Sequence, residues 1–548
     1  MDFVTPAGFR DIMPDEALRR EQMVQRVQSC FSEHGYAPIE TPTLERLDVM
    51  QASGRLPASP FKLFDAAGDL LALRPDVTMQ VARMCATRLR GNEGPFKFRY
   101  TQRVFRETDN QAAARELTQI GLENIGEAGS AADAEVVGLM AQALRLCGLH
   151  DFRIAIGTVG VLRALLQACE APGSWKNDVL TAYHQSNFTE LDRLTNLPEA
   201  PSRYAQAIAQ LPHIYGDRQA IAQARALVEP LGCIDGLDEL DATFALLEEE
   251  GLGDVLMVDF SIMSSFDYYT GIVFEAYAPH AGTSLGSGGR YDQMLSAYDG
   301  IDRPASGFAF YLETVSSAVL LNSNSSREDS LAERPLRIAV PKGSLAADTV
   351  ACLAAAGLDT TGLDNPGRQL VISNPGVDYI IVRPTDAPAF VALGAADCGI
   401  CGKDSLLEAD PDVVELVDLG FGGCRFVVAE PEGATPRVQQ RYEQLGSIRV
   451  ATKYPRITRA YYERIGMQVD IVKLHGNIEL APMVGMAERI VDITATGTTL
   501  RENKLQIVDE VLESTARFFA NNCAFRTDGR VAELARALRA QCSAGEGE

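Results

Sequence analysis

The chain has 548 residues, 46% of them hydrophobic and 23% charged, which is typical of a globular protein with three or four domains. Its 50 basic and 74 acidic side chains give a net charge of −24, which argues against general nucleic-acid binding because that binding needs Lys and Arg to neutralise phosphates. No run of 18 apolar residues occurs, and residues 1–6 (MDFVTP) lack the basic start of an export signal. We therefore expect a cytoplasmic protein that binds neither nucleic acid nor a membrane.

The first 321 residues are predicted to form an α+β region. Residues 133–147 have helical periodicity, residues 152–156 and 267–277 look like strands, and residues 160–250 are rich in Ala and Leu, as helices are. A polar, Ser-rich stretch follows, and we predict a linker at residues 322–335.

Six segments of this region resemble the catalytic core of class II histidyl-tRNA synthetases, in the same order. They are residues 8–14 (GFRDIMP), 73–78 (LRPDVT), 104–107 (VFRE), 118–123 (TQIGLE), 266–271 (FDYYTG) and 288–292 (GGRYD). The resemblance implies an antiparallel sheet with helices, and it implies a retained histidine pocket. The matching positions are Asp76, Thr78, Arg106, Gln119, Glu123, Tyr269 and Tyr291. Carboxylates suit an ammonium or imidazolium group, and an arginine suits a carboxylate.

Three positions depart from the synthetase pattern. Thr314 stands where the resemblance implies an arginine that grips ATP, and Ser264 stands where it implies an arginine that supports histidyl-adenylate formation. Thr108 takes the place of a glutamate, and no basic anticodon-binding region follows. We therefore expect aminoacylation to be disabled.

The chain after the predicted linker begins with a strand that runs into a lysine-bearing turn, residues 336–345 (LRIAVPKGSL). Residues 381–391 and 394–404 likewise combine strand edges or turns with charged side chains. Residues 479–500 (ELAPMVGMAERIVDITATGTTL) contain a short apolar strand, an Asp and a turn rich in hydroxyl groups. If a helix follows, its first N–H groups, Gly497 and the Thr hydroxyls would converge on a phosphate. A bare TGTT turn also fits an ordinary strand–turn–helix corner.

The longer pattern of residues 479–500 resembles the signature of ATP phosphoribosyltransferase, the first enzyme of histidine biosynthesis, and the likeness extends over residues 336–541. It implies two α/β lobes of the periplasmic-binding-protein type. Lobe one is expected at about 336–428 plus 516–541, and lobe two at about 429–515. Residues 513–541 are predicted to be helical, and residues 542–548 are predicted to be a disordered tail.

This resemblance implies a reaction in which N1 of ATP joins C1 of phosphoribosyl diphosphate and pyrophosphate leaves. Lys342, Arg368 and Arg383 are candidates to meet the diphosphate or the ATP phosphates. Mg²⁺ is the expected cofactor, and because it leans on substrate phosphates we assign no residue as a metal ligand. The residues expected to bind phosphoribosyl diphosphate are Asp492, Thr494, Ala495, Thr496, Gly497, Thr498 and Thr499.

The synthetase-like half also resembles the regulatory subunit that accompanies the short form of this transferase, so the chain is interpreted as a fusion of the two. Histidine is the expected inhibitor, and a homo-oligomer built on dimers, a tetramer or larger, is expected. An active synthetase is a second hypothesis, against which Ser264 and Thr314 argue. A solute-binding protein is a third, but it would carry an export signal and would not need the phosphate loop.

Overall fold

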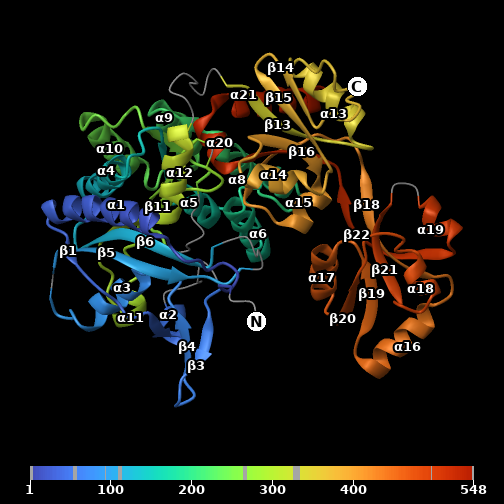
Figure 1. Cartoon of the computed structure of the whole chain (residues 1–548), viewed down its shortest axis with the longest axis horizontal. Helices are drawn as coiled ribbons and strands as arrows, with labels where there is room; N and C mark the ends of the chain where they lie inside the picture. Colours follow the sequence, from blue (N-terminus) through green and yellow to red (C-terminus); the bar gives the residue numbers. More distant parts are fainter. Residues whose placement is uncertain are drawn as a thin grey trace. The chain divides into compact units, whose positions relative to one another are not determined.

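The computed structural model describes residues 4–52, 59–92, 94–108, 114–262, 268–279, 281–324, 334–494 and 497–545. The chain divides into two units, whose elements are labelled in Figure 1. Unit 1 contains Met1–Leu331 and Asn522–Asp528, and unit 2 contains Ala332–Asn521 and Gly529–Glu548. Within the described ranges no helix is both long and apolar enough to cross a membrane.

A nine-stranded sheet forms the centre of unit 1. In order across the sheet its strands are β1 (Ala37–Pro38), β5 (Phe96–Phe105), β6 (Glu116–Ile125), β12 (Ala305–Tyr311), β11 (Gly286–Arg290), β10 (Ile272–Tyr277), β7 (Arg153–Thr158), β9 (Leu256–Asp259) and β8 (Tyr215–Gly216). The six strands from β5 to β7 in this order pair antiparallel, which confirms the predicted antiparallel sheet. A small sheet stands beside it, with the order β2 (Leu44–Arg46), β4 (Leu70–Leu73) and β3 (Lys62–Phe64).

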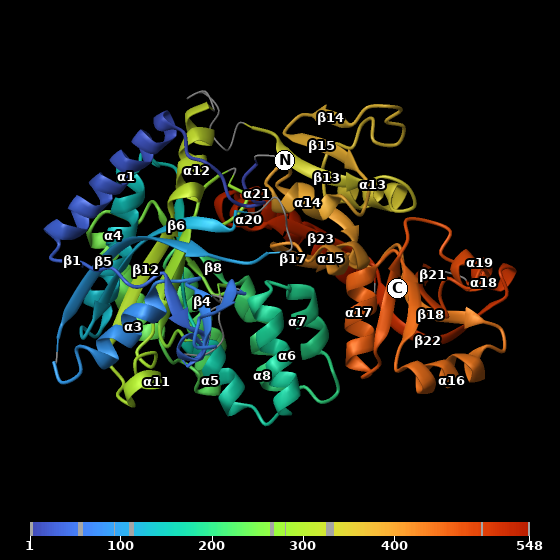
Figure 2. The ribbon, with the colours of Figure 1, turned by 60° about the horizontal axis from the view of Figure 1, so that its bottom comes forward.

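Helix α4 (Ser130–Leu146) is buried because it packs against the central sheet on one side and against helices on the other. Helices α6 (Gly173–His184), α7 (Phe188–Thr195) and α8 (Ser202–Gln210) pack side by side (Figure 2). The other helices of unit 1 are α1 (Pro14–Glu33), α2 (Leu47–Gln51), α3 (Thr78–Thr87), α5 (Gly160–Ala168), α9 (Gln219–Val228), α10 (Leu237–Glu249), α11 (Ser296–Asp299), α12 (Leu312–Asn324) and α20 (Asn522–Thr527), with 3₁₀ turns η1 (Leu211–His213) and η2 (Glu229–Leu231).

The helices and strands predicted in this half are largely present. The helix expected at 133–147 is α4, the strand at 152–156 lies within β7, and residues 160–250 contain α5 to α10. The strand expected at 267–277 is shorter than predicted, because the described residues before Ile272 form a turn and bend.

The first lobe of unit 2 contains a six-stranded sheet. Its strands in order are β14 (Val371–Asn374), β15 (Val377–Val382), β13 (Leu336–Pro341), β16 (Cys398–Gly402), β23 (Ala516–Asn521) and β17 (Val413–Asp418). Strand β13 is parallel to both β15 and β16. The helices of this lobe are α13 (Ala346–Ala355), α14 (Ala387–Ala392), α15 (Lys403–Ala409) and α21 (Gly529–Gly545).

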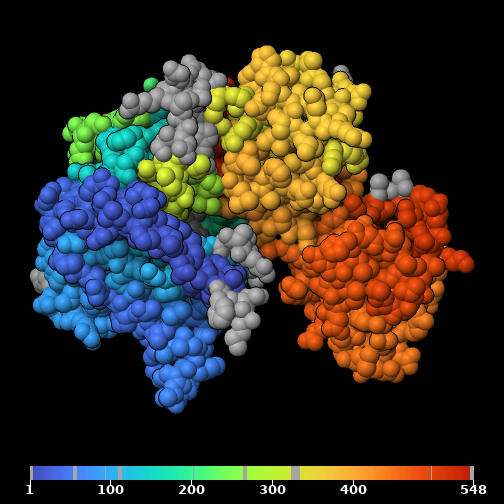
Figure 3. Space-filling model, in the orientation of Figure 1, coloured from blue at the N-terminus to red at the C-terminus, as the bar shows by residue number. Residues whose placement is uncertain are grey.

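The second lobe contains a five-stranded sheet and is the deep orange body in the space-filling view (Figure 3). Its strands in order are β20 (Val469–Lys473), β19 (Ile448–Thr452), β21 (Arg489–Thr494), β18 (Cys424–Pro431) and β22 (Leu505–Ser514). Its helices are α16 (Thr435–Leu445), α17 (Pro455–Arg464), α18 (Leu480–Met483) and α19 (Thr498–Glu502). The chain passes between the two sheets at residues 419–423 and again at residue 515, so unit 2 has the two lobes expected.

Several predicted boundaries differ from the structure. The lobe boundary at 428/429 falls inside β18, which belongs entirely to the second lobe. The helix predicted for 513–541 is wrong at its start, because β22 reaches Ser514 and β23 is a strand in the interior of the first sheet. Residues 522–528 fall in unit 1 and not in the first lobe, where the sequence predicts them.

The two predicted non-regular segments can be placed only in part. Helix α12 extends to Asn324, inside the predicted linker, and residues 325–333 lie outside the described residues. Helix α21 continues to Gly545, so residues 542–545 are helical rather than disordered, and residues 546–548 also lie outside the description.

The core of the second lobe is centred on Phe426 of β18. Its side chain is fully buried and meets the Tyr454 ring edge-on, with 4.8 Å between the ring centroids. Val450 and Val491 belong to the same cluster of buried side chains. This packing holds β18, β19 and β21 together, and it fixes the turn that follows β19.

Replacing Phe426 with Ala should lower the free energy of unfolding of this lobe by about 3–5 kcal/mol, because it removes a buried ring and leaves a cavity. The measurement is the urea midpoint of the transition of unit 2, followed by hydrogen exchange of β18 and β19. Leu445→Ala is the control. That side chain is 62% exposed at the end of α16, so its loss should change stability by less than about 0.5 kcal/mol. Equal effects of the two changes would contradict this description of the core.

Candidate functional site

Two charged side chains meet at one edge of the second lobe. Strands β19 and β21 are parallel with Thr452 opposite Val491, so Lys453 and Asp492 reach the same edge of the sheet. Lys453 Nζ lies 3.9 Å from Asp492 Oδ2. Burial raises the pKa of the Asp492 carboxyl group, and the positive charge of Lys453 opposes that shift. The edge therefore presents a carboxylate with a cation beside it.

The turn after β21 has the predicted strand–turn–helix form. Thr494 ends the strand, and its Oγ1 accepts a hydrogen bond of 2.8 Å from the Gly497 N–H. Gly497 has φ 72°, a left-handed conformation that glycine adopts at no steric cost. Thr498 and Thr499 begin α19 and are exposed. Ala495 and Thr496 lie outside the described residues. The role of this turn in substrate binding stays a prediction.

The three cationic side chains predicted in the first lobe lie next to backbone segments that are hydrogen-bonded to one another. Pro341 pairs with Val382, and the Lys342 N–H donates to the Val382 carbonyl over 2.9 Å, so Lys342 and Arg383 emerge together at the carboxyl ends of β13 and β15. Leu370 O accepts a hydrogen bond from Ile381 N, which brings Arg368, two residues upstream of Leu370, toward the same end of the sheet. All three residues are exposed.

Sequence reasoning missed two residues at these edges. Lys453 follows a short apolar strand, and only the pairing of β19 with β21 reveals that it faces Asp492. Asp404 follows β16, which is parallel to β13, and its Oδ1 accepts a hydrogen bond of 3.0 Å from the Ser514 hydroxyl. Ser514 ends β22, so this bond lies where the chain passes between the two lobes.

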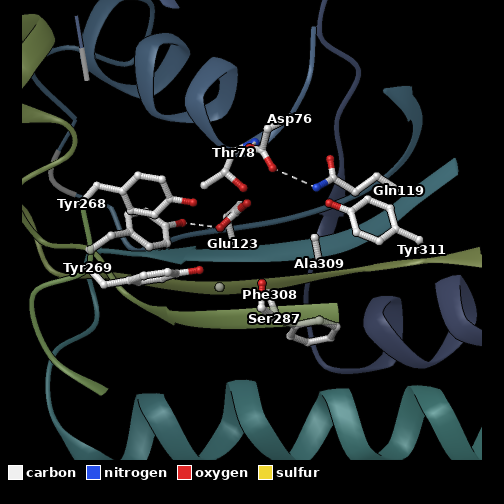
Figure 4. A pocket seen from close by; sticks show the side chains of 12 residues that line it. Asp76, Thr78, Gln119, Glu123, Tyr268, Tyr269, Ser287, Phe308, Ala309 and Tyr311 are labelled. Atoms are coloured by element: carbon white, nitrogen blue, oxygen red, sulfur yellow. Dashed lines mark hydrogen bonds between the residues drawn. The ribbon is translucent and has the colours of Figure 1, made fainter. Parts of the chain in front are cut away.

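A small cavity of about 20 Å³ lies on the central sheet of unit 1 (Figure 4). Six of the seven residues predicted to hold histidine line it, namely Asp76, Thr78, Gln119, Glu123, Tyr269 and Tyr291. Tyr268, Ser287 and Tyr311 also line it, and sequence reasoning missed them. The residues come from α3, β6, β11 and β12 and from the turns beside them, so the fold brings together segments that are far apart in the sequence.

Arg106 is the predicted residue that does not line the cavity. Its guanidinium lies 4.9 Å from the centroid of the Tyr311 ring and donates to the Tyr311 hydroxyl. Its Nε also donates to the Pro75 carbonyl over 3.4 Å. Arg106 is therefore held behind Tyr311, beside the cavity.

Two carboxyl groups face the cavity in different electrostatic settings. Glu123 is buried and accepts hydrogen bonds from the hydroxyls of Tyr100, over 3.1 Å, and Tyr291. Burial raises the pKa of Glu123 to about 8, so its carboxyl group is mostly protonated at neutral pH. Asp76 accepts hydrogen bonds from Thr78 N over 2.7 Å and from Gln119 Nε2 over 2.9 Å.

The floor of the cavity has to be glycine. A Cβ atom on Gly307 would stand 2.0 Å from Glu123 Oε2, and one on Gly289 would stand 2.7 Å from the Tyr269 ring. Both contacts are closer than atoms can approach. The two glycines thus let the carboxyl group and the ring lie directly on the sheet.

The cavity as it stands has room for about one water molecule. The Tyr268 and Tyr269 rings fill the space beside Glu123, with 4.8 Å between their centroids (Figure 4). An amino acid can enter only if lining side chains move. The residues are therefore suited in kind to a zwitterionic ligand, in a closed arrangement.

The positions that depart from the synthetase pattern can be placed in part. Thr314 lies in the first turn of α12, next to Glu313, which accepts a hydrogen bond of 2.8 Å from Thr118 N and pairs with Arg20. Thr108 lies between β5 and β6 and is half-buried. Ser264 lies outside the described residues.

Comparison with known proteins assigns each half of the chain to a family. The family model described as histidyl-tRNA synthetase matches residues 8–315, and that described as ATP phosphoribosyltransferase matches residues 383–540. The ATP phosphoribosyltransferase of Rubrobacter xylanophilus is 51% identical over 193 residues, which are 35% of this chain and 89% of the relative. The ATP phosphoribosyltransferase regulatory subunit of Moorella thermoacetica is 37% identical over 313 residues, which are 56% of this chain and 80% of the relative.

Solved structures agree with this assignment for the N-terminal half. An ATP phosphoribosyltransferase regulatory subunit/histidyl-tRNA synthetase from Bacillus halodurans C has a TM-score of 0.55 at 27% identity, covering 70% of this chain and 93% of that one. A histidine–tRNA ligase subunit from Alicyclobacillus acidocaldarius has a TM-score of 0.51 at 31% identity, covering 59% and 98%. The chain therefore belongs to the ATP phosphoribosyltransferase family, the pentosyltransferases of the first step of histidine biosynthesis, and it carries the histidyl-tRNA synthetase-like regulatory region and the transferase in one polypeptide.

Proposed function

We propose that unit 2 joins N1 of the ATP adenine to C1 of phosphoribosyl diphosphate at the edge formed by Lys453, Asp492 and the turn at Gly497, and that histidine in the pocket of unit 1 lowers this activity. The observation that carries the first part is the buried Asp492 carboxylate beside Lys453, directly before a left-handed turn with exposed hydroxyls. The second part rests on the set of side chains that line the pocket.

The reaction is a substitution at an anomeric carbon. The lone pair of adenine N1 forms a bond to C1 while the bond from C1 to the diphosphate oxygen breaks, and pyrophosphate leaves with that electron pair. Positive charge develops on the ribose ring in the transition state. The Asp492 carboxylate, little hydrated because it is buried, is suited to stabilise that charge and to hold the ribose hydroxyls. Thr494, Thr498 and Thr499 offer hydroxyls to the 5′-phosphate.

The leaving diphosphate and the ATP phosphates need cations. We assign this role to Lys342, Arg368 and Arg383, which are exposed and share the carboxyl edge of β13 and β15. Lys453 is a further candidate, because its ammonium group lies at the opposite lobe's edge beside Asp492. These residues position the phosphates and require no covalent intermediate.

Mg²⁺ fits this arrangement as an ion carried by the substrates. Mg²⁺ usually leans on substrate phosphates and water rather than on a cage of protein ligands. Asp492 and Asp404 would be the carboxylates that meet its water shell. When bound, the ion would neutralise diphosphate charge.

In the regulatory pocket, Asp76 and Glu123 are suited to the ammonium and imidazole groups of histidine. Gln119, Thr78, Tyr269 and Tyr291 supply hydrogen bonds, and Arg106 stands behind Tyr311, where it can meet the ligand carboxylate once that ring moves. We expect no aminoacylation, because Thr314 and Ser264 replace arginines. A homo-oligomer built on dimers also remains part of this proposal.

Replacing Asp492 with Asn should lower kcat/KM for phosphoribosyl diphosphate by about a hundredfold, because a neutral amide stabilises the developing positive charge poorly. The assay follows the absorbance of phosphoribosyl-ATP with the full chain, ATP, phosphoribosyl diphosphate and Mg²⁺. Asp470→Asn is the control, since Asp470 is an exposed carboxylate of β20 in the same lobe. An inactive unmodified chain, or equal rates for the two variants, would contradict the assignment.

The affinity for histidine should rise severalfold, by no more than about tenfold, between pH 7 and pH 8.5. Burial raises the pKa of Glu123 to about 8, so below that pH the carboxyl group must lose a proton before it can pair with a cationic group of the ligand. The imidazole of histidine, with a pKa of about 6.5, is already mostly neutral in this range.

Calorimetry in buffers of different ionisation enthalpy measures both the affinity and the released proton. Glu123→Gln should bind histidine more weakly and lose the pH dependence, whereas Glu249→Gln, at the exposed end of α10, should behave as the unmodified chain. A pH-independent affinity in the unmodified chain would show that Glu123 does not pair with the ligand.

A further inference from the structure

Seven residues from the transferase part of the sequence belong to the regulatory unit. The chain leaves unit 2 after Asn521, at the end of β23, contributes Asn522–Asp528 to unit 1, and returns to unit 2 at Gly529. Within unit 1, helix α20 contacts β7 and β10.

An arginine fixes the segment in place. Arg526 Nε lies 2.9 Å from Asp259 Oδ2, and the two side chains are 2% and 1% exposed. The same guanidinium donates to the Ser261 hydroxyl over 3.2 Å and lies 4.8 Å from the centroid of the Tyr277 ring. Asp259 in turn accepts a hydrogen bond of 2.7 Å from Ser261 N. The contact is thus buried and directional.

Aromatic rings complete the surface that receives α20. Phe525 meets Phe188 of α7 with 6.4 Å between ring centroids, and it meets Tyr215 of β8 at 5.5 Å. Both pairs are edge-on, an arrangement that stabilises aromatic contacts. A phenylalanine and an arginine therefore anchor the segment through different chemistry.

The anchored residues lie in line with the histidine pocket. Glu123 pairs with Gly307, Gly307 with Gly289, Gly289 with Val273, and Val273 with Gly157. The register of β7 and β9 then brings Gly157 beside Asp259. Directly paired residues point to the same face of a sheet, so Glu123, Gly307, Gly289, Val273 and Gly157 form one row, and Asp259 lies beside its last residue. Three of the five residues of the row are glycines.

The tyrosine that closes the pocket lies on this row. The Tyr269 ring sits over Gly289, and Tyr268 lies against both Tyr269 and Tyr291. The opposite side of the cavity is held by the hydrogen bond between Asp76 and Gln119. Because the cavity holds about one water molecule, a larger ligand requires lining side chains to move, and Tyr269 is the lining side chain that lies on the row.

We propose that the contact of residues 522–528 with Asp259, Ser261, Tyr277, Phe188 and Tyr215 couples the pocket to strand β23 of the transferase. Displacement of Tyr269 changes the position of Asp259. The Arg526 guanidinium, which binds Asp259, transmits this change to Asn522, the first residue after β23. This coupling rests on the proposed role of the pocket in sensing histidine, because histidine binding is the signal that the coupling would transmit.

Arg526→Met tests the coupling in the full chain. We expect a catalytic rate without histidine within about twofold of the unmodified chain, a histidine affinity within about threefold, and a half-inhibiting histidine concentration at least about tenfold higher. Arg536→Met is the control, because Arg536 is an exposed arginine of α21 that bonds within its own helix. Unchanged inhibition in Arg526→Met would overturn the proposal while leaving histidine sensing intact.

A second variant distinguishes a loss of coupling from misfolding. Arg526→Met leaves the Asp259 carboxylate buried without its cation, whereas Asp259→Asn combined with Arg526→Met leaves no unpaired charge. The double variant should fold and should show the same loss of inhibition. Inhibition restored to its ordinary strength in the double variant would also overturn the proposal.

A third measurement does not depend on histidine. Gly307→Ala pushes Glu123 out of its position, since the new Cβ would stand 2.0 Å from Glu123 Oε2. Hydrogen exchange in residues 522–528 should then become faster in the full chain, and Gly307→Ala should cause no further increase in a chain that already carries Arg526→Met. Unaltered exchange in that segment, alongside altered exchange in β6, would overturn the coupling even if histidine neither binds nor inhibits.

Discussion

The register of parallel strands is the constraint on which the proposed chemistry of unit 2 depends. Pro341 pairs with Val382 in one lobe, and Thr452 pairs with Val491 in the other, and the charged residues follow immediately. A slip of one residue would turn every side chain of a strand to the other face. Lys453 would then no longer face Asp492. The buried side chains around Phe426 hold this register, so the apolar core decides where the charges lie.

A similar constraint governs the regulatory pocket, where glycines on the sheet let Glu123 lie in a buried position. An ionised carboxylate there would be costly without a cation, and burial accordingly favours the protonated form. In the closed pocket Glu123 is therefore mostly uncharged at neutral pH. A ligand that brings its own positive charge changes that balance, whereas a neutral ligand does not. Pairing with Glu123 therefore favours a ligand that carries an ammonium group over one that carries none.

The sequence was sufficient for the parts of the structure that have a local pattern. The strand that ends at Thr494 and the helix start at Thr498 carry their own signal. All seven predicted pocket residues lie in segments whose order matches the synthetase core, and six of them line the cavity. Strand β23 was mistaken for helix because Ala and Arg suit helices, and only its pairing with β16 and β17 makes it a strand. Tyr268 was passed over beside Tyr269, although both rings line the cavity.

Other features have no local signal at all. Lys453 becomes a candidate only when β19 lies beside β21, and no pattern within one segment reports that pairing. Arg526 pairs with Asp259 across 267 positions of the chain. Neither residue stands in a recognisable motif. Contacts of this kind depend on which strands become neighbours, and that is decided by the packing of the whole sheet rather than by the residues on either side.

Because the two regions are joined in one chain, the contact of α20 does not have to supply the affinity that holds them together. Separate chains must offset the loss of translational freedom on association, but residues 522–528 are tethered at both ends, at an effective concentration on the order of millimolar. The affinity of residues 522–528 for their surface is then of little consequence, and a buried ion pair contributes little to that affinity. The planar guanidinium of Arg526 instead provides direction, because it can bond Asp259 and Ser261 together in only one arrangement. A contact that adds little to stability but depends strongly on position is what coupling between the two regions requires.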